Sequence, residues 1–182
     1  MSWYALFVET GKEDMVRNMI LKFINESAIR AIVPKRKLQE RKQGRTNEIY
    51  KTMFPGYVFV NTKMNEEIYY DLKRLPKYNR LLIRDKPRDQ SNKNFHEVFR
   101  FSEIDEEEMT LILQLIGNEE LIDYSTLYVE NAKVIVCAGP LKGKEGLIKK
   151  IDKRKKRARI VLNILGNEVL LDVGIEVLAS PS

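Results

Sequence analysis

The N-terminal part of the chain combines short apolar runs with one amphipathic stripe. Residues 2–9 are apolar, aromatic and partly alternating, and Thr10-Gly11 ends the run, which predicts a strand. The following apolar residues recur three and four positions apart, behind an acidic start that the helix dipole favours. They predict a helix with a single apolar face, formed by Val16, Met19, Ile20, Phe23 and Ile24.

Two apolar segments then flank a polar stretch centred on Gln43-Gly44. Residues 29–33 and 49–60 are interpreted as the arms of one long hairpin. Pro55-Gly56 interrupts the second arm, which predicts a bulge or a sheet edge. Beyond the hairpin, residues 66–75 predict a second helix, and residues 81–83 predict a further strand.

A charged segment without periodicity, residues 84–100, precedes a third predicted helix. Ser102-Glu103-Ile104-Asp105 has the spacing of a capping box, with Asp in place of the usual Glu or Gln, so we expect the helix to begin after Ser102. Gly117 ends it, and its apolar stripe consists of Met109, Ile112, Leu113 and Ile116.

After residue 127 the pattern changes to short strand-like runs between Gly-, Asp- or Lys-rich turns, which is typical of a small β-barrel. Five strands are predicted, at residues 132–137, 146–151, 157–164, 169–173 and 175–178. The sequence therefore predicts an α+β protein with a first domain at residues 1–116, a linker at 117–127 and a five-stranded β-barrel domain at 128–182.

Composition excludes several classes of protein. With 43% hydrophobic residues in 182, the chain can bury a core, and no apolar run approaches the ~18 residues of a membrane span. The first apolar run is too short for a signal peptide, so we expect a cytoplasmic protein. Cys137 and His96 are the only residues of their types, so a disulfide within the chain is excluded and a zinc site is not expected. We expect no metal, no cofactor and no catalytic residue.

The positive charge is concentrated in the C-terminal third. Residues 1–128 contain 21 basic and 20 acidic residues, whereas residues 129–182 contain 11 basic and 6 acidic ones. Eight of the eleven residues from Lys149 to Arg159 are Lys or Arg, which favours nucleic-acid binding over a merely solvated turn. Strand alternation places Arg157 and Arg159 on the outer face, opposite Ala158, Ile160 and Leu162.

A glycine-rich turn at residues 139–146 raises the question of a phosphate-binding loop. The spacing excludes a P-loop, because three residues separate Gly139 from Gly143 and the chain continues into an apolar strand at Gly146-Leu147-Ile148. A valine-rich strand, Gly139-Pro140, a basic turn, a glycine and another apolar strand instead resemble the KOW motif of ribosomal proteins and NusG-type elongation factors.

The N-terminal part resembles the NusG N-terminal (NGN) domain in several successive landmarks. These are Trp3-Tyr4-Ala5-Leu6, Gly11 before an amphipathic helix, Val33-Pro34, Phe54-Pro55-Gly56-Tyr57-Val58-Phe59-Val60, and the helix that begins near Ser102. Together with the KOW-like barrel, the resemblance to the NusG family covers nearly the whole chain apart from residues 84–100. It implies an antiparallel sheet with flanking helices, tethered to a KOW β-barrel.

The resemblance also implies that the NGN domain binds the clamp of RNA polymerase through an exposed apolar patch. We expect Phe54 and Tyr57 to be contact residues because they flank Pro55-Gly56, whereas Trp3, Val58 and Val60 are expected in the sheet core. The full set expected to bind polymerase is Phe54, Tyr57, Met53, Tyr4, Phe7 and Tyr50.

The C-terminal domain departs from general NusG at two places. General NusG usually has a Phe before and an Arg after the glycine of the loop that meets Rho and a ribosomal protein; Leu165 and Asn167 stand there and argue against both contacts. The lysine-rich tip resembles LoaP-type paralogs, antiterminators that recognise a hairpin in the nascent leader RNA. The RNA-binding residues expected here are Lys142, Lys144, Lys149, Lys150, Lys153, Arg154, Lys155, Lys156, Arg157 and Arg159.

The expected partners are therefore RNA polymerase and a nascent RNA hairpin, bound by a monomer that contacts no membrane; a contact with the displaced DNA strand is left open. One alternative is a housekeeping NusG that couples polymerase to Rho or the ribosome. A ribosome-associated KOW protein would leave Phe54-Pro55-Gly56-Tyr57 unexplained, and an enzyme would have only His96 to use. A switch of the barrel to helices is disfavoured by β-branched alternation within residues 159–164 and 169–173.

Overall fold

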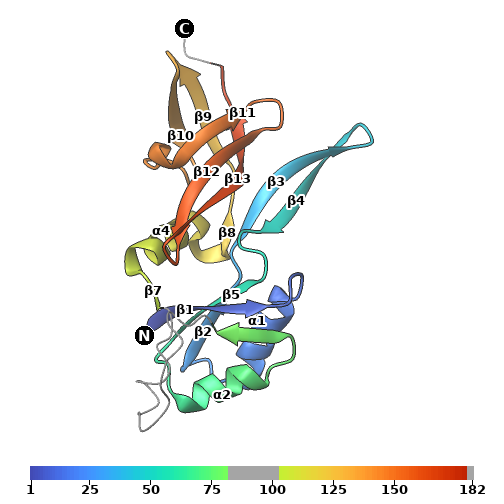
Figure 1. Ribbon diagram of the computed structural model, residues 1–182. Coiled ribbons are helices and arrows are strands. Elements are labelled where there is room, and N and C mark those ends of the chain that lie inside the picture. The colour runs from blue at the N-terminus through green and yellow to red at the C-terminus, as the bar shows by residue number, and fades with distance from the viewer. Residues whose placement is uncertain (82–102, 180–182) are drawn as a thin grey trace. The chain divides into compact units, whose positions relative to one another are not determined.

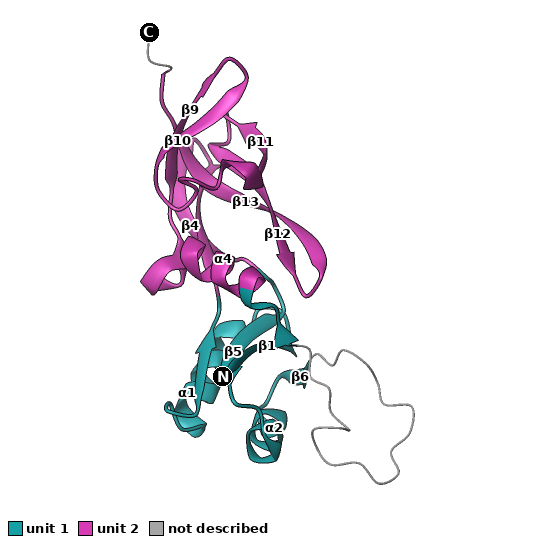
Figure 2. Ribbon diagram, turned by 90° about the vertical axis from the view of Figure 1, so that its left-hand side faces the viewer, with its two compact units in different colours: residues 1–33, 54–106 teal, residues 34–53, 107–182 magenta. Residues whose placement is uncertain are grey.

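The computed structural model describes residues 1–81 and 103–179, which form two compact units (Figure 2). Unit 1 contains Met1–Val33 and Phe54–Glu106, and unit 2 contains Pro34–Met53 and Glu107–Ser182. The predicted division places residues 34–53 in the first domain and residues 117–127 in a linker, whereas the structure groups both segments with the C-terminal strands. The predicted domain boundaries stay a prediction, because the packing of a segment does not decide which family domain it belongs to.

Unit 1 is built on one antiparallel sheet, with two helices packed on one face (Figure 1). β5 lies between β2 and β1, and β6 and β7 both pair with β1. The strand predicted at residues 2–9 and the first two predicted helices are confirmed. The elements are β1 (Ser2–Val8), α1 (Glu13–Phe23), β2 (Ile29–Ile32), β5 (Tyr57–Thr62), α2 (Glu66–Arg74), β6 (Tyr78–Leu81) and β7 (Glu103–Ile104).

The core of unit 1 follows from strand alternation. Leu6 of β1 and Val60 of β5 point to the face on which the helices lie, where they pack with Val16 and Ile20 of α1 and Leu72 of α2. All five side chains are buried. The other face of the sheet carries the intervening residues, and these are considered below as a contact surface.

The predicted long hairpin is confirmed, with each of its arms divided into two strands. The base of the hairpin, β2 paired with β5, belongs to the sheet of unit 1. Its turn end, β3 (Lys35–Lys42) paired with β4 (Arg45–Thr52), belongs to unit 2, where β8 (Leu121–Ile122) also pairs with β3. The predicted turn is confirmed: Gln43 and Gly44 join Lys42 to Arg45 with φ of 51° and 78°. Two positive φ angles are what a tight hairpin turn requires.

Pro55-Gly56 interrupts the second arm as predicted, but by a turn rather than by a bulge or a sheet edge. The Tyr57 amide donates to the Phe54 carbonyl at 3.1 Å, and Gly56 has a φ of +84°, the left-handed value needed at the third residue of a type II turn. The Gly56 amide donates to the buried carboxylate of Glu13 at 2.7 Å. This turn lies directly before β5.

The third predicted helix is present but begins later than predicted. α4 spans Glu106–Ile116, because Glu103 and Ile104 pair with β1 as β7 instead of capping a helix. The predicted capping residue Ser102, the segment 84–100 with His96, and positions 82–83 of the predicted strand lie outside the described residues. Gly117 ends α4 as predicted and opens the short 3-10 helix η1 (Gly117–Glu119).

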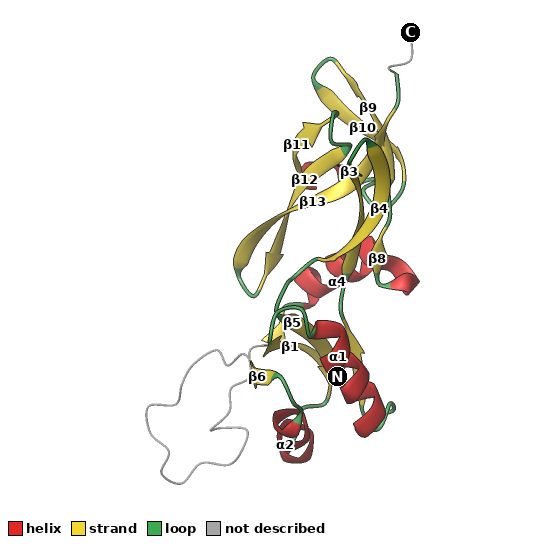
Figure 3. Cartoon of the chain, turned by 90° about the vertical axis from the view of Figure 1, so that its right-hand side faces the viewer, coloured by secondary structure: helices red, strands yellow, loops and turns green. Residues whose placement is uncertain are grey.

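Unit 2 contains a curled five-stranded sheet in the order β10-β9-β13-β12-β11 (Figure 3). Its strands are β9 (Ser125–Glu130), β10 (Lys133–Ala138), β11 (Ile148–Asp152), β12 (Arg157–Ile164) and β13 (Asn167–Val177). The predicted barrel strands at 132–137 and 157–164 are confirmed within one residue. β9 was not predicted, and a 3-10 helix, η2 (Glu145–Leu147), replaces the start of the second predicted strand.

Gly174 explains why the last two predicted strands are one strand. It was interpreted as a break, but β13 runs through it without interruption. A Cβ atom at this position would collide with the ring of Tyr124 and would lie 2.6 Å from the carbonyl oxygen of Lys37 in β3. Gly174 therefore permits the close approach of β3 and of the Tyr124 ring to β13.

We expect Gly174→Ala to destabilise unit 2 by about 1–3 kcal/mol or more, because overpacking displaces backbone as well as side chains. Chemical denaturation of the full chain measures the loss. The matched control is Gly146→Ala, since nothing lies within 4 Å of a Cβ at Gly146. Equal stability of the two variants would contradict the close packing described here.

Candidate nucleic-acid interface

The basic tip of unit 2 is an ordered turn between β11 and β12. Asp152 pairs with Arg157 across the end of the two strands, and the Asp152 carboxylate accepts a hydrogen bond from the Lys155 amide at 2.8 Å. Lys156 closes the turn with a φ of 52°, and its carbonyl accepts from the Ile175 amide at 3.1 Å. The turn residues are exposed, so a defined backbone presents Lys153, Arg154, Lys155 and Lys156 to solvent.

The alternation predicted for β12 is confirmed. Ala158, Ile160 and Leu162 are buried in the barrel, whereas Arg157 and Arg159 lie on the opposite face. The two arginines differ in exposure, since the Arg157 side chain is 19% exposed and the Arg159 side chain is 51% exposed.

Three arginines converge on Asp172 of β13. Arg159 donates to the carboxylate from Nε at 2.8 Å and from Nη2 at 3.4 Å, and Arg157 Nη1 lies 4.0 Å from it. Arg36 of β3 donates to the Asp172 main-chain carbonyl at 2.6 Å. The hydrogen bond from Arg159 and the neighbouring positive charges hold the pKa of Asp172 below its usual value. Burial lowers the pKa of Arg36, against the favourable charge of Asp172.

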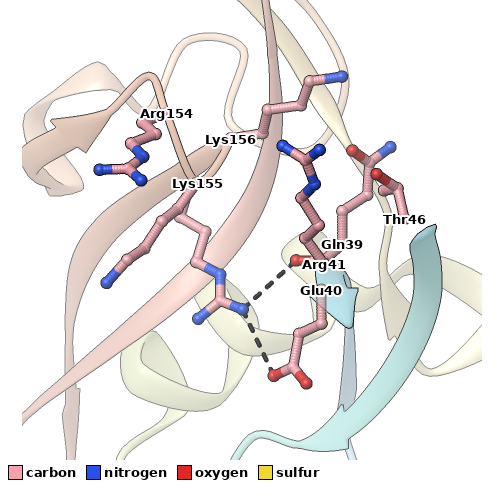
Figure 4. Close-up of a pocket in the computed structure, with 8 residues that line it drawn as sticks. Gln39, Glu40, Arg41, Thr46, Arg154, Lys155 and Lys156 are labelled. Carbon is pink, nitrogen blue, oxygen red and sulfur yellow. Dashed lines mark hydrogen bonds and ion pairs between the residues drawn. The ribbon is translucent and has the colours of Figure 1, made fainter. Parts of the chain in front are cut away.

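Arg157 also joins the barrel to the β3–β4 hairpin. Its Nη2 lies 3.4 Å from the main-chain oxygen of Gln39 and 3.5 Å from a carboxylate oxygen of Glu40 (Figure 4). Glu40 in turn forms an ion pair with Lys51 of β4 at 2.6 Å. The Lys51 hydrogen bond is the largest cause of the lowered pKa of Glu40, and Arg157 contributes. Arg157 thus serves as a bridge between strands, a role that its position in the sequence did not reveal.

A hollow of about 510 Å³ lies between this hairpin and the basic tip (Figure 4). One wall comes from β3–β4 and the other from the turn and the start of β12. Five basic residues and a single acidic one line it; the lining consists of Gln39, Glu40, Arg41, Thr46, Arg154, Lys155, Lys156 and Arg157. A smaller hollow of about 140 Å³ is lined by Lys150, Asp152, Lys155, Arg157, Arg159 and Asp172. An electropositive concave surface of this kind suits phosphate groups.

The hairpin wall was not among the predicted binding residues. Residues 35–51 contain seven basic and two acidic residues, a surplus that the count over residues 1–128 averaged away. A local charge count over the hairpin would have found it. Two residues predicted to bind RNA lie apart from the tip: Lys142 and Lys144 are in the turn between β10 and η2, and they line neither hollow. Lys149 is exposed on β11.

Of the aromatic residues predicted to bind polymerase, Phe7 and Tyr57 are accessible on the sheet of unit 1, whereas Phe54 is buried. Phe7 and Tyr57 are register partners on the sheet face opposite the helices, with ring centroids 5.6 Å apart, and both are partly exposed. Phe54 departs from the predicted exposure: it is 5% exposed, and its ring packs edge to face on Phe59 at 5.3 Å. Phe54 is therefore buried, and the accessible aromatic surface of this sheet face is the Phe7–Tyr57 pair.

The remaining predicted contact residues lie elsewhere. Tyr4 is buried in the core on the helix-covered face, where its hydroxyl donates to Glu103 at 3.0 Å and burial raises its pKa to about 12. That position corrects the expectation of an exposed Tyr4. Met53 is buried, and Tyr50, on β4 of unit 2, is 57% exposed with its hydroxyl donating to Glu48.

Comparison with known proteins identifies the family. Residues 1–112 match the family model described as transcription termination factor nusG, and residues 130–163 match the KOW motif. The chain belongs to the NusG family. Two NusG proteins described as transcription termination/antitermination proteins illustrate the distance within the family: one from Streptococcus pyogenes serotype M3 is 26% identical and one from Staphylococcus epidermidis is 24% identical. Each alignment covers 94% of this chain and 91% of the relative.

The fold agrees with that family. A solved structure described as domain interaction in Thermotoga maritima NusG matches 95% of this chain and 93% of its own, with a TM-score of 0.58 and 24% identity. The chain is accordingly a NusG-family transcription termination/antitermination factor. No helix within residues 1–81 and 103–179 is long and apolar enough to cross a membrane.

We expect the stability contribution of Asp172 to depend on pH. Its native pKa lies below the ordinary value of 3.8, so the contribution is complete above about pH 4 and is lost as the pH falls through the native pKa. Asp172→Asn should lower the melting temperature at pH 7 and make the decline of melting temperature between about pH 4 and pH 2 shallower.

Thermal melts of the full chain across this pH range test the prediction. Asp71→Asn, which removes an exposed carboxylate from α2 in unit 1, is the control. Parallel pH profiles for wild type and Asp172→Asn would contradict a stabilising role for Asp172.

Proposed function

We propose that this NusG-family protein is a processive antitermination and elongation factor of the cytoplasm, of the LoaP type. It acts as a monomer that binds without catalysis. Its NGN domain binds RNA polymerase, and its basic KOW domain binds a hairpin in the nascent leader RNA. The observation that supports RNA binding best is the ordered turn between β11 and β12, which presents several cations from a defined backbone beside Arg159.

Fixed cations suit an RNA stem for a physical reason. Asp152 restrains the backbone of the turn, and Asp172 restrains the Arg159 guanidinium, so less conformational entropy is lost when phosphates bind. Bases in an A-form stem are hidden in a deep, narrow groove, so sequence selection would reside in a loop or bulge. A guanidinium can stack on such an unpaired base.

The polymerase contact is assigned to the partly exposed Phe7–Tyr57 pair. A factor that binds the closed clamp more tightly than the open, pause-prone clamp shifts the enzyme toward the closed state, by the ratio of the two affinities. While the factor is bound, tethering raises the local concentration of its RNA-binding surface to the order of mM. Modest affinity for RNA then suffices to select particular transcripts.

The alternative is a housekeeping NusG that couples polymerase to Rho or the ribosome. The turn that would make those contacts contains Leu165 and Gly166, whose amides both donate to the Glu108 carboxylate of α4, at 2.8 Å and 3.2 Å. A turn held in this way, with Leu165 and Asn167 at its two contact positions, favours the specialised factor. Co-purification with Rho would favour the housekeeping alternative.

Tyr57→Ala should weaken binding to core RNA polymerase at least several-fold, since truncation of a central aromatic contact often costs about 2 kcal/mol. Equilibrium titration with labelled full-length protein measures the affinity. The control is Tyr70→Ala, which removes a partly exposed tyrosine from α2. Unchanged affinity in folded Tyr57→Ala protein would exclude this surface.

Phe54→Ala should chiefly lower stability, because Phe54 is buried against Phe59.

Binding of the full chain to a stem-loop from its own leader transcript should depend steeply on salt. With about five phosphate contacts, log K should fall with log salt at a slope on the order of −4. Lys155→Gln should flatten the slope by about one unit. Lys133→Gln, on the opposite edge strand β10, is the charge-matched control and should leave it unchanged. Absence of RNA binding, or equal binding to every stem-loop, would contradict the proposal.

A further inference from the structure

The β3–β4 hairpin has more basic residues than its own two acidic residues can pair with. Its two acidic residues are paired within the hairpin: Glu40 with Lys51 at 2.6 Å and Glu48 with Lys37 at 3.2 Å. Arg36 is directed to Asp172 of β13. Among the residues that the structure describes, no carboxylate forms an ion pair with Arg41, which points its guanidinium into the hollow shared with the basic tip (Figure 4).

The wall opposite the hairpin, formed by the basic tip, also has cations without acidic partners in the described structure. Arg154, Lys155 and Lys156 line the hollow, and within the described part of the chain none of the three is in an ion pair. The only carboxylate of the lining, Glu40, is already neutralised by Lys51 and Arg157. Cations on two opposed walls repel one another, and an anion placed between them removes the repulsion from both sides at once.

The lining also matches a nucleic-acid backbone in its neutral groups. Thr46 and Gln39 offer a hydroxyl and an amide beside the cations, and such groups donate to phosphate oxygens or to a ribose hydroxyl. The hollow is open to solvent at about 510 Å³ and has no apolar floor among its lining residues. A run of successive phosphates fits this arrangement better than a compact apolar ligand.

We infer that the β3–β4 hairpin is the second wall of the RNA-binding site, so that the RNA backbone passes between Arg41 and the basic tip formed by residues 153–156. The site is then composite: its walls are far apart in sequence and are joined by the Arg157 bridge to Gln39 and Glu40. This inference rests on the proposed RNA-binding function and extends it, because the resemblance to NusG assigned RNA binding to the KOW domain alone.

Affinity and salt dependence of Arg41→Gln in the full chain test this inference. The probe is the synthetic leader stem-loop, titrated into wild type, Arg41→Gln, Lys155→Gln, their double variant and the control Lys133→Gln. Each single variant of the two walls should bind several-fold more weakly and flatten the salt slope by about one unit, and the double variant should flatten it by about two. Thermal melts establish that each variant is folded.

The outcomes separate the two proposals. If wild type does not bind the RNA, the proposed function fails. If Lys155→Gln weakens binding while folded Arg41→Gln behaves like Lys133→Gln, RNA binding stands and the second wall is wrong. If a polyglutamate peptide displaces the stem-loop at equal charge concentration, the groove is a site for acidic proteins, and the inference is overturned.

Discussion

The carboxylate of Asp172 is the constraint on which the basic face of unit 2 depends. Arg159 binds it directly, Arg157 lies within 4.0 Å, and Arg36 reaches the carbonyl of the same residue from another strand. Three guanidinium groups held this close would repel one another if no carboxylate lay between them. Together with Glu40, which pairs with Arg157 from β3, Asp172 therefore allows the hairpin and the barrel, both rich in cations, to pack within one unit.

The acidic residues Asp172 and Glu40 determine which cations hold the strands together and which face the hollow. Asp172 and Glu40 occupy the arginines that connect the strands, whereas the cations of the tip and Arg41 remain directed to the hollow. The backbone of the tip is already ordered by Asp152, so only side-chain freedom is lost when phosphates bind, and binding through these charges depends on salt. In the described part of the chain the cations of the tip and Arg41 are outside ion pairs and available to an anion, whereas Arg159 is held by Asp172 beside the tip.

The sequence predicted the elements that depend on local periodicity. The helices α1 and α2, the turn at Gln43-Gly44 and the alternation of β12 all follow from spacing and turn chemistry. Strand pairing was predictable only where the two strands are arms of one hairpin. The pairing of β2 with β5 follows from the predicted hairpin, whereas the pairing of β7 with β1 joins segments far apart in the sequence and was not predicted.

Only the part of the candidate site that is contiguous in the sequence was predicted. The tip of residues 153–156 is contiguous in sequence and was found, but its second wall comes from a hairpin more than a hundred residues away. Gly174 was taken for a break because the ring of Tyr124 that requires it is close only in space. Strand alternation places Tyr4 and Phe7 on opposite faces of the sheet. Which of these faces is buried depends on where the helices pack, and the sequence did not reveal that.

The most direct test of the central claim, that this basic face holds nascent RNA during transcription, is photocrosslinking in a transcribing complex. RNA polymerase would be halted just after the leader hairpin, with a photoreactive base in the hairpin and the full-length factor bound. Mass spectrometry of the crosslinked peptides then locates the contact. The account predicts crosslinks to residues 39–46 and to residues 153–157 in the same complexes. Crosslinks that spare both segments while the factor remains bound to polymerase would contradict it.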